Sequence, residues 1–338
     1  MQKAVANMSP KEKAAHFGRM VWTELPVIAT IRGVLDVARM AHGTSLGGKV
    51  SLIHGPNGVG KSVACDHYFR SIANAENGAF VGTDVRFQAT DSILDAAWVT
   101  TTVGNRERRN FVKVDLSPRL TGNGLLSDMV RGLTLKDPPH AARHDKLLHA
   151  IKKILVGTGT EVLILDNAHR AVERNIAVGN SEAGDIIAEI AKKTGVEVVL
   201  VGTELATTLF TNSKELNLIK RQNQAVSILP MPATNSTEFL TLVSKFQERL
   251  PFARRSDLTS DKVTTRLYEF SKGNPQKLAV FLQSAVLLAL TDKLEFIDLG
   301  TLADAYERFI GSTPVNPNPF IGTRSSGATR VEASEEPA

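Results

Sequence analysis

The sequence predicts an α/β fold with a parallel sheet, followed by a small all-helical domain. Short apolar strands alternate with amphipathic helices from about residue 50 to residue 205, and this order is typical of a parallel sheet covered on both faces. After about Pro230 only helical periodicity remains. A glycine-rich segment also lies between the first apolar strand and the next helix. We therefore expect four segments: an N-terminal helical extension at 1–20, a core at 21–230, a helical lid at 231–311 and a disordered tail at 312–338.

The first half of the core gives clear local signals. Ser9, Pro10 and Glu12 predict a helix start, with a capping hydroxyl, a proline in the first turn and a glutamate three residues after the cap. A helix in "VIATIRGVLDVARMAHG" precedes the strand "KVSLIHG", and another helix runs from about Lys61 to Asn74. The strand-like segments "AAWVTTTV" and "FVKVDL" flank "GNRERRN", which we interpret as a turn with three arginines.

The second half of the chain continues the alternation and then becomes helical. Helices are expected near Gly124–Leu135 and Ala141–Val156, followed by the strand "EVLILD", the glycine-capped helix "SEAGDIIAEIAKKTG" and the strand "VEVVLVGT". Four helical segments form the lid: "TNSTEFLTLVSKFQERLP", "DKVTTRLYEFSKG", "PQKLAVFLQSAVLLAL" and "DLGTLADAYERFI". From Ser312 onward Pro, Ser, Gly and Asn dominate, which predicts disorder. The motif "NPNPF" is there either a docking peptide or the end of a linker.

Composition sets broad limits. Of 338 residues, 42% are hydrophobic and 22% charged, as in ordinary globular proteins. A net charge of +5 fits a nucleic-acid partner without requiring one. The single cysteine, Cys65, excludes a disulfide framework and favours a reducing compartment; we expect a buried small residue rather than a reactive thiol. No apolar run is long enough to span a bilayer and no signal-peptide pattern is present, so we expect a cytoplasmic protein.

The segment "GPNGVGKS" carries the strongest chemical signal. It fits G-x-x-x-x-G-K-[ST] in full, between an apolar strand and a helix. In such a loop backbone N–H groups and the helix N-terminus surround phosphates. We expect Lys61 to contact the β- and γ-phosphates of ATP, and Ser62 to coordinate Mg²⁺. The expected nucleotide-binding residues are Gly55, Pro56, Asn57, Gly58, Val59, Gly60, Lys61, Ser62 and Val63.

The segment "VLILDNAHRA" supplies a second candidate element of the same site. Asp166 ends an apolar strand and is expected to support the Mg²⁺ shell, although a plain surface aspartate is the alternative. Asn167 follows, and an amide cannot accept a proton from water at neutral pH. It can still orient water, so we expect ATP binding with slow hydrolysis. His169 is more consistent with a polar loop residue than with a titrating catalytic group.

Together, these segments resemble AAA+ ATPases, and in particular the TniB/TnsC group of transposition regulators related to phage Mu B protein. The resemblance covers about residues 20 to 310 and is carried by "GPNGVGKS", "LILDNAH", "VVLVGTELATTLF", "LVSKFQERLPFARRSDLT" and "FSKGNPQKLAVFLQSAVLLAL". It implies an AAA+ core with a helical lid and sequence-nonspecific binding of double-stranded DNA. It also implies self-assembly into a ring or helical filament, and partnership with a TniQ-type targeting factor and a DDE transposase.

The resemblance assigns three further site residues. Thr203 lies where a sensor of the γ-phosphate is expected, with a strand-end cap as the alternative. Arg221 lies where the arginine finger that reaches a neighbouring subunit's ATP is expected; Lys220, a register shift and a solvated helix end remain open. In "GNPQK" the usual lid arginine is missing, and Lys277 is the candidate for phosphate contact, without bidentate geometry.

DNA contacts are expected from the arginine turn and the segment after it. By the resemblance, basic and hydroxyl residues of this region bind the DNA backbone, which gives salt-dependent affinity without sequence reading. A solvated charged turn is the alternative. The expected DNA-binding residues are Arg106, Arg108, Arg109, Lys113, Arg119 and Thr121. Two other functions stay open: a nucleotide-gated scaffold with negligible hydrolysis, and an AAA+ ATPase of the helicase-loader or secretion type.

Overall fold

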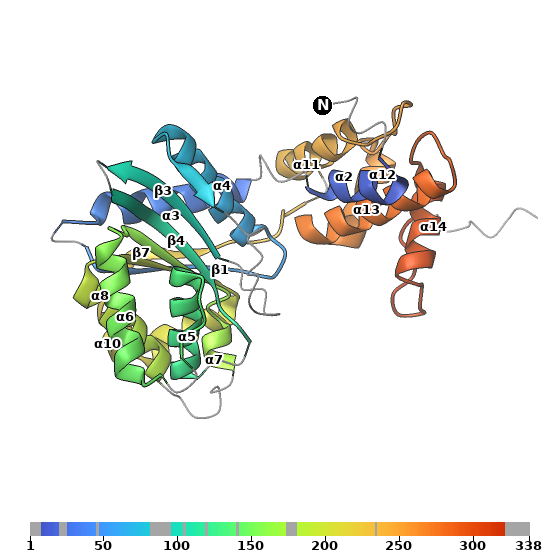
Figure 1. The fold of residues 1–338 in the computed structure, drawn as a ribbon. Coiled ribbons are helices and arrows are strands. Elements are labelled where there is room, and N and C mark those ends of the chain that lie inside the picture. The colour runs from blue at the N-terminus through green and yellow to red at the C-terminus, as the bar shows by residue number, and fades with distance from the viewer. Residues whose placement is uncertain are drawn as a thin grey trace, which may run out of the picture. The chain divides into compact units, whose positions relative to one another are not determined.

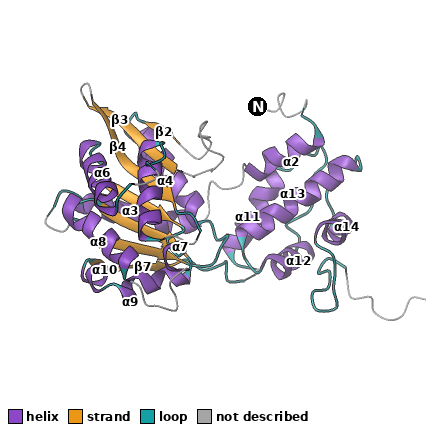
Figure 2. Cartoon of the chain, turned by 60° about the horizontal axis from the view of Figure 1, so that its bottom comes forward, coloured by secondary structure: helices purple, strands orange, loops and turns teal. Residues whose placement is uncertain are grey.

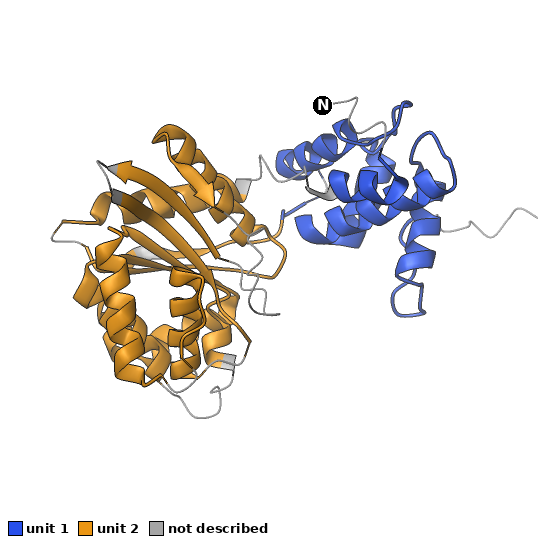
Figure 3. Ribbon diagram, in the orientation of Figure 1, with its two compact units in different colours: residues 1–21, 231–338 blue, residues 22–230 orange. Residues whose placement is uncertain are grey.

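The computed structural model describes residues 8–19, 26–44, 47–81, 96–103, 106–118, 121–139, 142–173, 181–233 and 235–321. The chain divides into two compact units, coloured separately in Figure 3. One unit is the stretch 22–230, and the other combines 1–21 with 231–338. The N-terminal helix is therefore part of the helical unit, rather than the separate extension that the sequence suggested.

The α/β unit is built on one mixed sheet (Figures 1 and 2). Within the described residues the sheet has seven strands in the order β2-β3-β4-β5-β6-β1-β7. Strands β4, β5, β6, β1 and β7 run parallel, while β3 is antiparallel to both β2 and β4. The strands are β1 Val50–His54, β2 Ala79–Val81, β3 Ala96–Val103, β4 Arg106–Asp115, β5 Val162–Asp166, β6 Glu197–Gly202 and β7 Lys220–Ser227.

Helices cover both faces of this sheet, as the alternation predicted. The helices α3 (Pro26–Ala41) and α4 (Lys61–Ala75) pack on one face. The helices α5 (Gly122–Thr134), α6 (His144–Gly157) and α8 (Glu182–Thr194) pack on the other. The shorter elements are α7 Arg170–Glu173, the 3-10 turn η1 Glu204–Thr207, α9 Thr208–Asn212 and α10 Lys214–Leu218.

Side chains of β4 alternate between these two faces. Val112 and Val114 join the main apolar core beneath α5 and α6. Phe111 points the other way, because its ring lies 5.6 Å from that of Tyr68 on α4. Lys113 shares this second face. The last part of β4 thus presents Phe111 and Lys113 to the helix that follows the glycine-rich loop.

The helical unit contains α2 (Pro10–Arg19), α11 (Thr237–Glu248), α12 (Asp261–Ser271), α13 (Pro275–Thr291) and α14 (Leu299–Phe309). The start of α2 is the predicted capping box, since Ser9 N–H donates to Glu12 at 2.8 Å and Glu12 N–H donates to the Ser9 hydroxyl at 3.3 Å. Helix α2 packs along α13. In the described part of the chain, no helix combines the length and apolarity that crossing a membrane requires.

Two local expectations are wrong. The segment "RERRN" belongs to β4 and pairs with β3, so only residues 104–105 separate the strands; β-sheet pairing has overridden the polarity of the arginines.

The expected disordered tail is packed as far as residue 321. Phe320 is 4% exposed and its ring lies 4.9 Å from that of Phe281, nearly parallel to it. Burial of this ring stabilises an ordered conformation of a segment whose Pro- and Asn-rich composition predicted disorder.

Candidate nucleotide-binding site

The glycine-rich loop wraps closely between β1 and α4. Gly55 has φ 152°, and a Cβ atom there would lie 2.1 Å from the carbonyl oxygen of Ile228. Gly60 caps α4 with φ 98°, in the left-handed region that glycine adopts readily. The Gly55 N–H donates to the Gly202 carbonyl at 3.2 Å, which ties the loop to the end of β6. The loop is therefore shaped by a close backbone approach at Gly55, which a side chain would obstruct, and by a left-handed conformation at Gly60 that other residues rarely adopt.

Lys61 lies inside this loop. Its side chain is 8% exposed, and its ammonium donates to the carbonyls of Gly55 and Pro56, both at 2.8 Å. Burial lowers the pKa of Lys61, and the Asp166 carboxylate opposes that shift. Among the described residues, no carboxylate lies within ion-pair distance of this ammonium. A buried cation held only by neutral carbonyls fits a phosphate partner.

The end of β5 brings the second candidate element to the same edge of the sheet. Asp166 is 4% exposed and accepts the backbone N–H of Asn167 at 2.8 Å. Asn167 has φ 55°, a left-handed conformation that asparagine tolerates better than most residues. Its side-chain amide donates to Asp115 Oδ1 at 2.6 Å. Asp115 ends β4 and is the register partner of Asp166.

The residues present fit a magnesium ion held mainly by phosphate and water. The described residues contain no group of three His, Cys, Asp or Glu side chains that could hold a metal ion by themselves. Mg²⁺ needs few protein ligands when it is bound to nucleotide phosphates. Ser62, half-buried in the first turn of α4, and Asp166 would hold it, and the ion would neutralise charge on the phosphate oxygens.

Thr203 lies at the end of β6, beside the loop. Its backbone N–H donates to His169 Nδ1 at 3.3 Å, and His169 is 9% exposed. The histidine is therefore a buried support of the strand end rather than a polar loop residue. The neighbouring Glu204 contacts His54 at 2.5 Å. The position of Thr203 agrees with the expected sensor, whose role stays a prediction.

Arg221 does not have the geometry expected of an arginine finger. It is the second residue of β7 rather than a residue before that strand, and its side chain is 13% exposed. Its guanidinium lies 2.5 Å from Glu197, a carboxylate that is 1% exposed. Because the guanidinium pairs with a buried carboxylate of its own chain, it does not extend toward the nucleotide of a neighbouring subunit. Lys220 is also occupied, with its ammonium 5.1 Å from the centre of the Phe210 ring.

Lys277 lies in the other unit, in the first turn of α13. Asn274 caps this helix by accepting the Lys277 N–H at 3.1 Å. The lysine ammonium lies 4.6 Å from the centre of the Phe270 ring. Its predicted contact with nucleotide phosphate stays a prediction.

The predicted DNA-binding residues that the structure describes do not form one cluster. Arg108 is exposed near the beginning of β4, whereas Thr121 lies beyond the end of that strand and caps α5 by accepting the Gly124 N–H at 3.0 Å. Seven residues of strand separate Arg108 from Asp115, which corresponds to about 23 Å. The two regions thus lie toward opposite ends of β4. Arg119 and the side chain of Arg106 lie outside the described part of the chain.

The assignment of Lys113 to DNA is wrong, and that of Arg109 is weakened. Lys113 is 3% exposed and lies 2.5 Å from Asp66 on α4, so its charge is not available to DNA. Arg109 donates to the Leu133 carbonyl at 2.7 Å and lies over the Trp98 ring at 4.9 Å. Arg108 is the arginine of this strand whose described side chain is well exposed.

This sheet, with a glycine-rich loop between β1 and α4 and an aspartate at the end of β5, defines the AAA+ P-loop fold. Residues 45–210 match a family model described as an AAA domain. No curated protein matches the chain.

Two solved structures share the fold. Cdc6p from Pyrobaculum aerophilum has a TM-score of 0.58 and 12% identity, over 87% of this chain and 70% of that one. The Drosophila ORC structure, which is bound to DNA, has a TM-score of 0.54 and 13% identity, over 91% of this chain and 67% of that one. At these identities the likeness shows the AAA+ fold with its helical domain.

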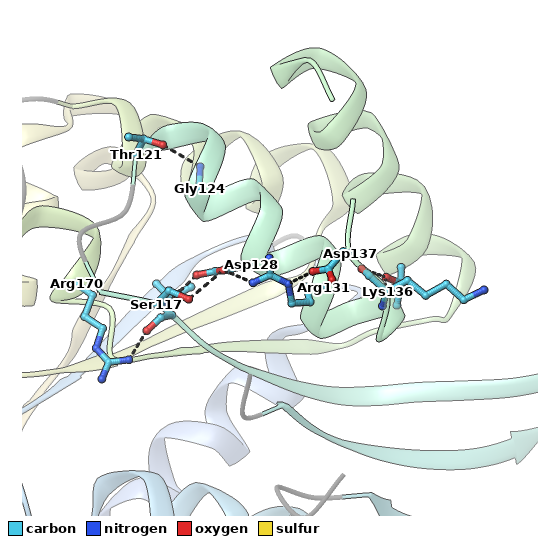
Figure 4. A network of polar contacts seen from close by, with 10 residues as sticks. Ser117, Thr121, Gly124, Asp128, Arg131, Lys136, Asp137 and Arg170 are labelled. Atoms are coloured by element: carbon cyan, nitrogen blue, oxygen red, sulfur yellow. Dashed lines mark hydrogen bonds and ion pairs between the residues drawn. The ribbon is translucent and has the colours of Figure 1, made fainter. Parts of the chain in front are cut away.

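Sequence reasoning missed Asp115 and Arg170. The guanidinium of Arg170 lies 3.3 Å from Asp115 Oδ1, and the same arginine donates to the Leu116 carbonyl (Figure 4). A signal for Asp115 was present, because "FVKVD" and "VLILD" are both apolar strands that end in aspartate. Nothing local in the sequence indicates that these two ends are adjacent.

Proposed function

We propose that the chain is an ATP- and Mg²⁺-dependent DNA-binding ATPase that regulates transposition. In this proposal it assembles on double-stranded DNA without reading its sequence, receives a TniQ-type targeting factor and recruits a DDE transposase. The observation that carries the nucleotide part is Lys61, buried in a glycine loop beside Asp166. The transposition part is supported by the lid segments "LPFARRSDLT" and "FSKGNPQKLAVFLQSAVLLAL", which resemble those of TniB/TnsC proteins.

Each site residue has a proposed role in ATP binding. Lys61 and the loop N–H groups hold the β- and γ-phosphates. Ser62 and Asp166 hold the ion, and Thr203 responds to the γ-phosphate. Lys277 approaches the phosphates from the lid when nucleotide is bound. The arginine finger is a residue other than Arg221, because removing that guanidinium from Glu197 would leave a buried carboxylate unpaired.

Hydrolysis is proposed to be slow compared with an AAA+ ATPase that has glutamate at the position of Asn167. The amide orients but does not deprotonate, and it is already bonded to Asp115. Slow hydrolysis leaves an ATP-bound assembly on DNA for longer, which suits a protein that marks a target. The same hydrogen bond favours a second candidate, a nucleotide-gated scaffold in which hydrolysis is negligible.

Electron microscopy of the purified protein with duplex DNA tests the proposal. We expect rings or filaments on DNA with ATP, their loss with ADP, and no assembly by Lys61→Ala, which keeps the sheet but lacks the phosphate-binding ammonium. Phosphate release then separates the candidates, since the scaffold predicts no turnover above Lys61→Ala. If ATP produces no DNA-dependent assembly, the transposition proposal fails and an AAA+ ATPase of the helicase-loader or secretion type takes its place.

Recruitment requires a separate experiment. DNA-bound assemblies formed with ATP are mixed with a DDE transposase from the same genetic element and collected by sedimentation. We expect the transposase to sediment with wild-type assemblies and to stay in solution with Lys61→Ala. Equal sedimentation with DNA alone would contradict recruitment.

A further inference from the structure

The helical unit contains a pocket of about 910 Å³, lined by parts of α12, α13 and α14 (Figure 2). Lys277, Val280 and Ser284 line it at helical spacing, so one face of α13 borders the pocket. The end of α12 adds Phe270, and the end of α14 adds Phe309. The described residues that line this α13 pocket all belong to the helical unit. The pocket is therefore formed without the α/β unit.

The segment after α14 forms one wall of the α13 pocket, through Asn316, Pro317 and Pro319. Asn318 holds this wall in place, because its side-chain amide donates to Glu307 on α14 at 2.8 Å. The motif "NPNPF" begins at Asn316. It thus contributes to a recessed surface of the protein, rather than only ending the packed part of the chain.

Large apolar side chains of the α13 pocket are accessible to solvent. Val280 is 57% exposed, Phe309 46% and Ile310 45%. Single exposed apolar residues are common on proteins, but several around one depression are typical of an interaction site. Pockets for small ligands enclose most of the ligand surface, whereas these side chains remain about half exposed. The pocket therefore suits side chains of a polypeptide that lies across it.

The charged side chains of the α13 pocket give it a positive sign. Lys272 and Lys277 are exposed and line it. Among the residues that the structure describes, neither ammonium has a carboxylate within ion-pair distance. Glu269 also lines the pocket, but it pairs with Arg266 at 3.1 Å. The two lysines favour a ligand with carboxylates and disfavour a basic one.

We propose that the α13 pocket binds a segment of a partner protein in which a large apolar side chain is flanked by aspartate or glutamate. The apolar side chain inserts among Val280, Phe309 and Ile310, and the carboxylates pair with Lys272 and Lys277. An apolar anchor gives such a segment its affinity, and the charges select its sequence. This inference goes beyond the proposed ATPase function and does not depend on it.

Selection from a phage-displayed library of short random peptides tests which chemistry the pocket accepts. Peptides are selected on the full-length wild-type chain and counter-selected on Val280→Glu, which places a carboxylate within the apolar surface. We expect the enriched peptides to combine a large apolar residue with neighbouring acidic residues. Enrichment of basic or uncharged peptides overturns the proposed chemistry, and no enrichment over the counter-selection overturns the site.

Fluorescence anisotropy with the most enriched peptide then gives the Kd of each variant. We expect Val280→Glu to raise Kd by more than tenfold and Lys272→Glu to raise it by about tenfold, because reversing one charge turns an attraction into a repulsion. Leu294→Glu, at a 43% exposed position outside the pocket, and Lys262→Glu, at the other end of α12, are the matched controls and keep the wild-type Kd. Equal effects at the pocket and control positions overturn the site.

A change in the peptide supplies a readout that needs no protein variant. Replacing its aspartates and glutamates by asparagine and glutamine should weaken binding to the wild-type chain by about tenfold, and this loss should shrink as salt concentration rises. Unchanged binding overturns the role of the lysines even if a protein variant does not fold. ATP hydrolysis is not measured in any of these experiments, so their failure leaves the ATPase proposal standing.

Two other occupants are distinguished by separate measurements. Sedimentation of the wild-type chain without DNA or nucleotide shows whether it self-associates, and self-association that Val280→Glu abolishes would assign the pocket to a second copy. A synthetic peptide of residues 331–338, a segment outside the described residues that contains three glutamates, would assign the pocket to the chain itself if it displaced the selected peptide. Either result overturns the proposal of a partner protein. A monomeric chain with no displacement supports it.

Discussion

The ammonium of Lys113 lies 2.5 Å from the carboxylate of Asp66, and this ion pair joins β4 to α4 inside the α/β unit. Burial by itself lowers the pKa of Lys113, but the nearby Asp66 and Asp166 carboxylates outweigh it and leave that pKa raised. The lysine is therefore charged at neutral pH, and its charge is used in an ion pair inside the protein. It supports the strand that carries Asp115.

Lys113→Ala is expected to destabilise the α/β unit without changing DNA binding in a salt-dependent way. Removing the buried lysine leaves Asp66, which is 23% exposed, without this partner, and we expect the free energy of unfolding to fall by about 1–3 kcal/mol, less than for a fully buried pair. Urea denaturation measures this loss. Lys153→Ala, an exposed position on α6, is expected to stay within about 0.5 kcal/mol of the wild type. If Lys113→Ala instead reduces the slope of log DNA affinity against log salt concentration and leaves stability unchanged, Lys113 contacts DNA.

Arg108→Ala is expected to reduce the salt dependence of DNA binding. Each neutralised phosphate contributes about 0.9 to the slope of log affinity against log salt concentration, so loss of one contact lowers the slope by about that amount. Titrations of labelled duplex at several salt concentrations give the slope. The exposed Lys193 on α8 provides the control, and Lys193→Ala should retain the wild-type slope. An unchanged slope in Arg108→Ala would remove this end of β4 from the DNA interface.

Phe320→Ala is expected to destabilise the helical unit strongly. The ring is 4% exposed and stacks on Phe281 at 4.9 Å, and loss of a buried phenylalanine ring costs about 3–5 kcal/mol. The free energy of unfolding of the full chain gives the effect. Val315 lies in the same segment and is 96% exposed, so Val315→Ala should be close to neutral. Equal effects of the two substitutions would mean that the segment is not packed in solution.

Cys65 is expected to resist alkylation in the folded protein. The side chain is fully buried in α4, and burial raises the pKa of its thiol, so little of the reactive thiolate forms at pH 8. Iodoacetamide labelling followed by mass spectrometry should modify it only after denaturation. Rapid labelling of the native protein would show that α4 opens, and would contradict the buried position.

Much of the fold and part of the site follow from local sequence. The capping box at Ser9 and Glu12, the apolar strands and the helical periods of the lid are determined by neighbours a few residues apart, and the structure contains them. The phosphate loop is equally local, since eight consecutive residues specify a backbone that only glycines at key positions can adopt. These features can be predicted from the sequence because the residues that cause each of them lie within one short segment.

The remaining features depend on which segments meet in space. Whether an arginine or lysine faces solvent or a buried carboxylate is decided by a partner far along the chain, as for Lys113 with Asp66 and Arg221 with Glu197. The order of the strands places Asp115 beside Asp166, 51 positions later in the chain. The sequence by itself determined the phosphate loop and the two strand-ending aspartates. Only the tertiary structure joined Asp115 to Asn167, because parallel strands must meet side by side before their carboxyl ends share one edge of the sheet.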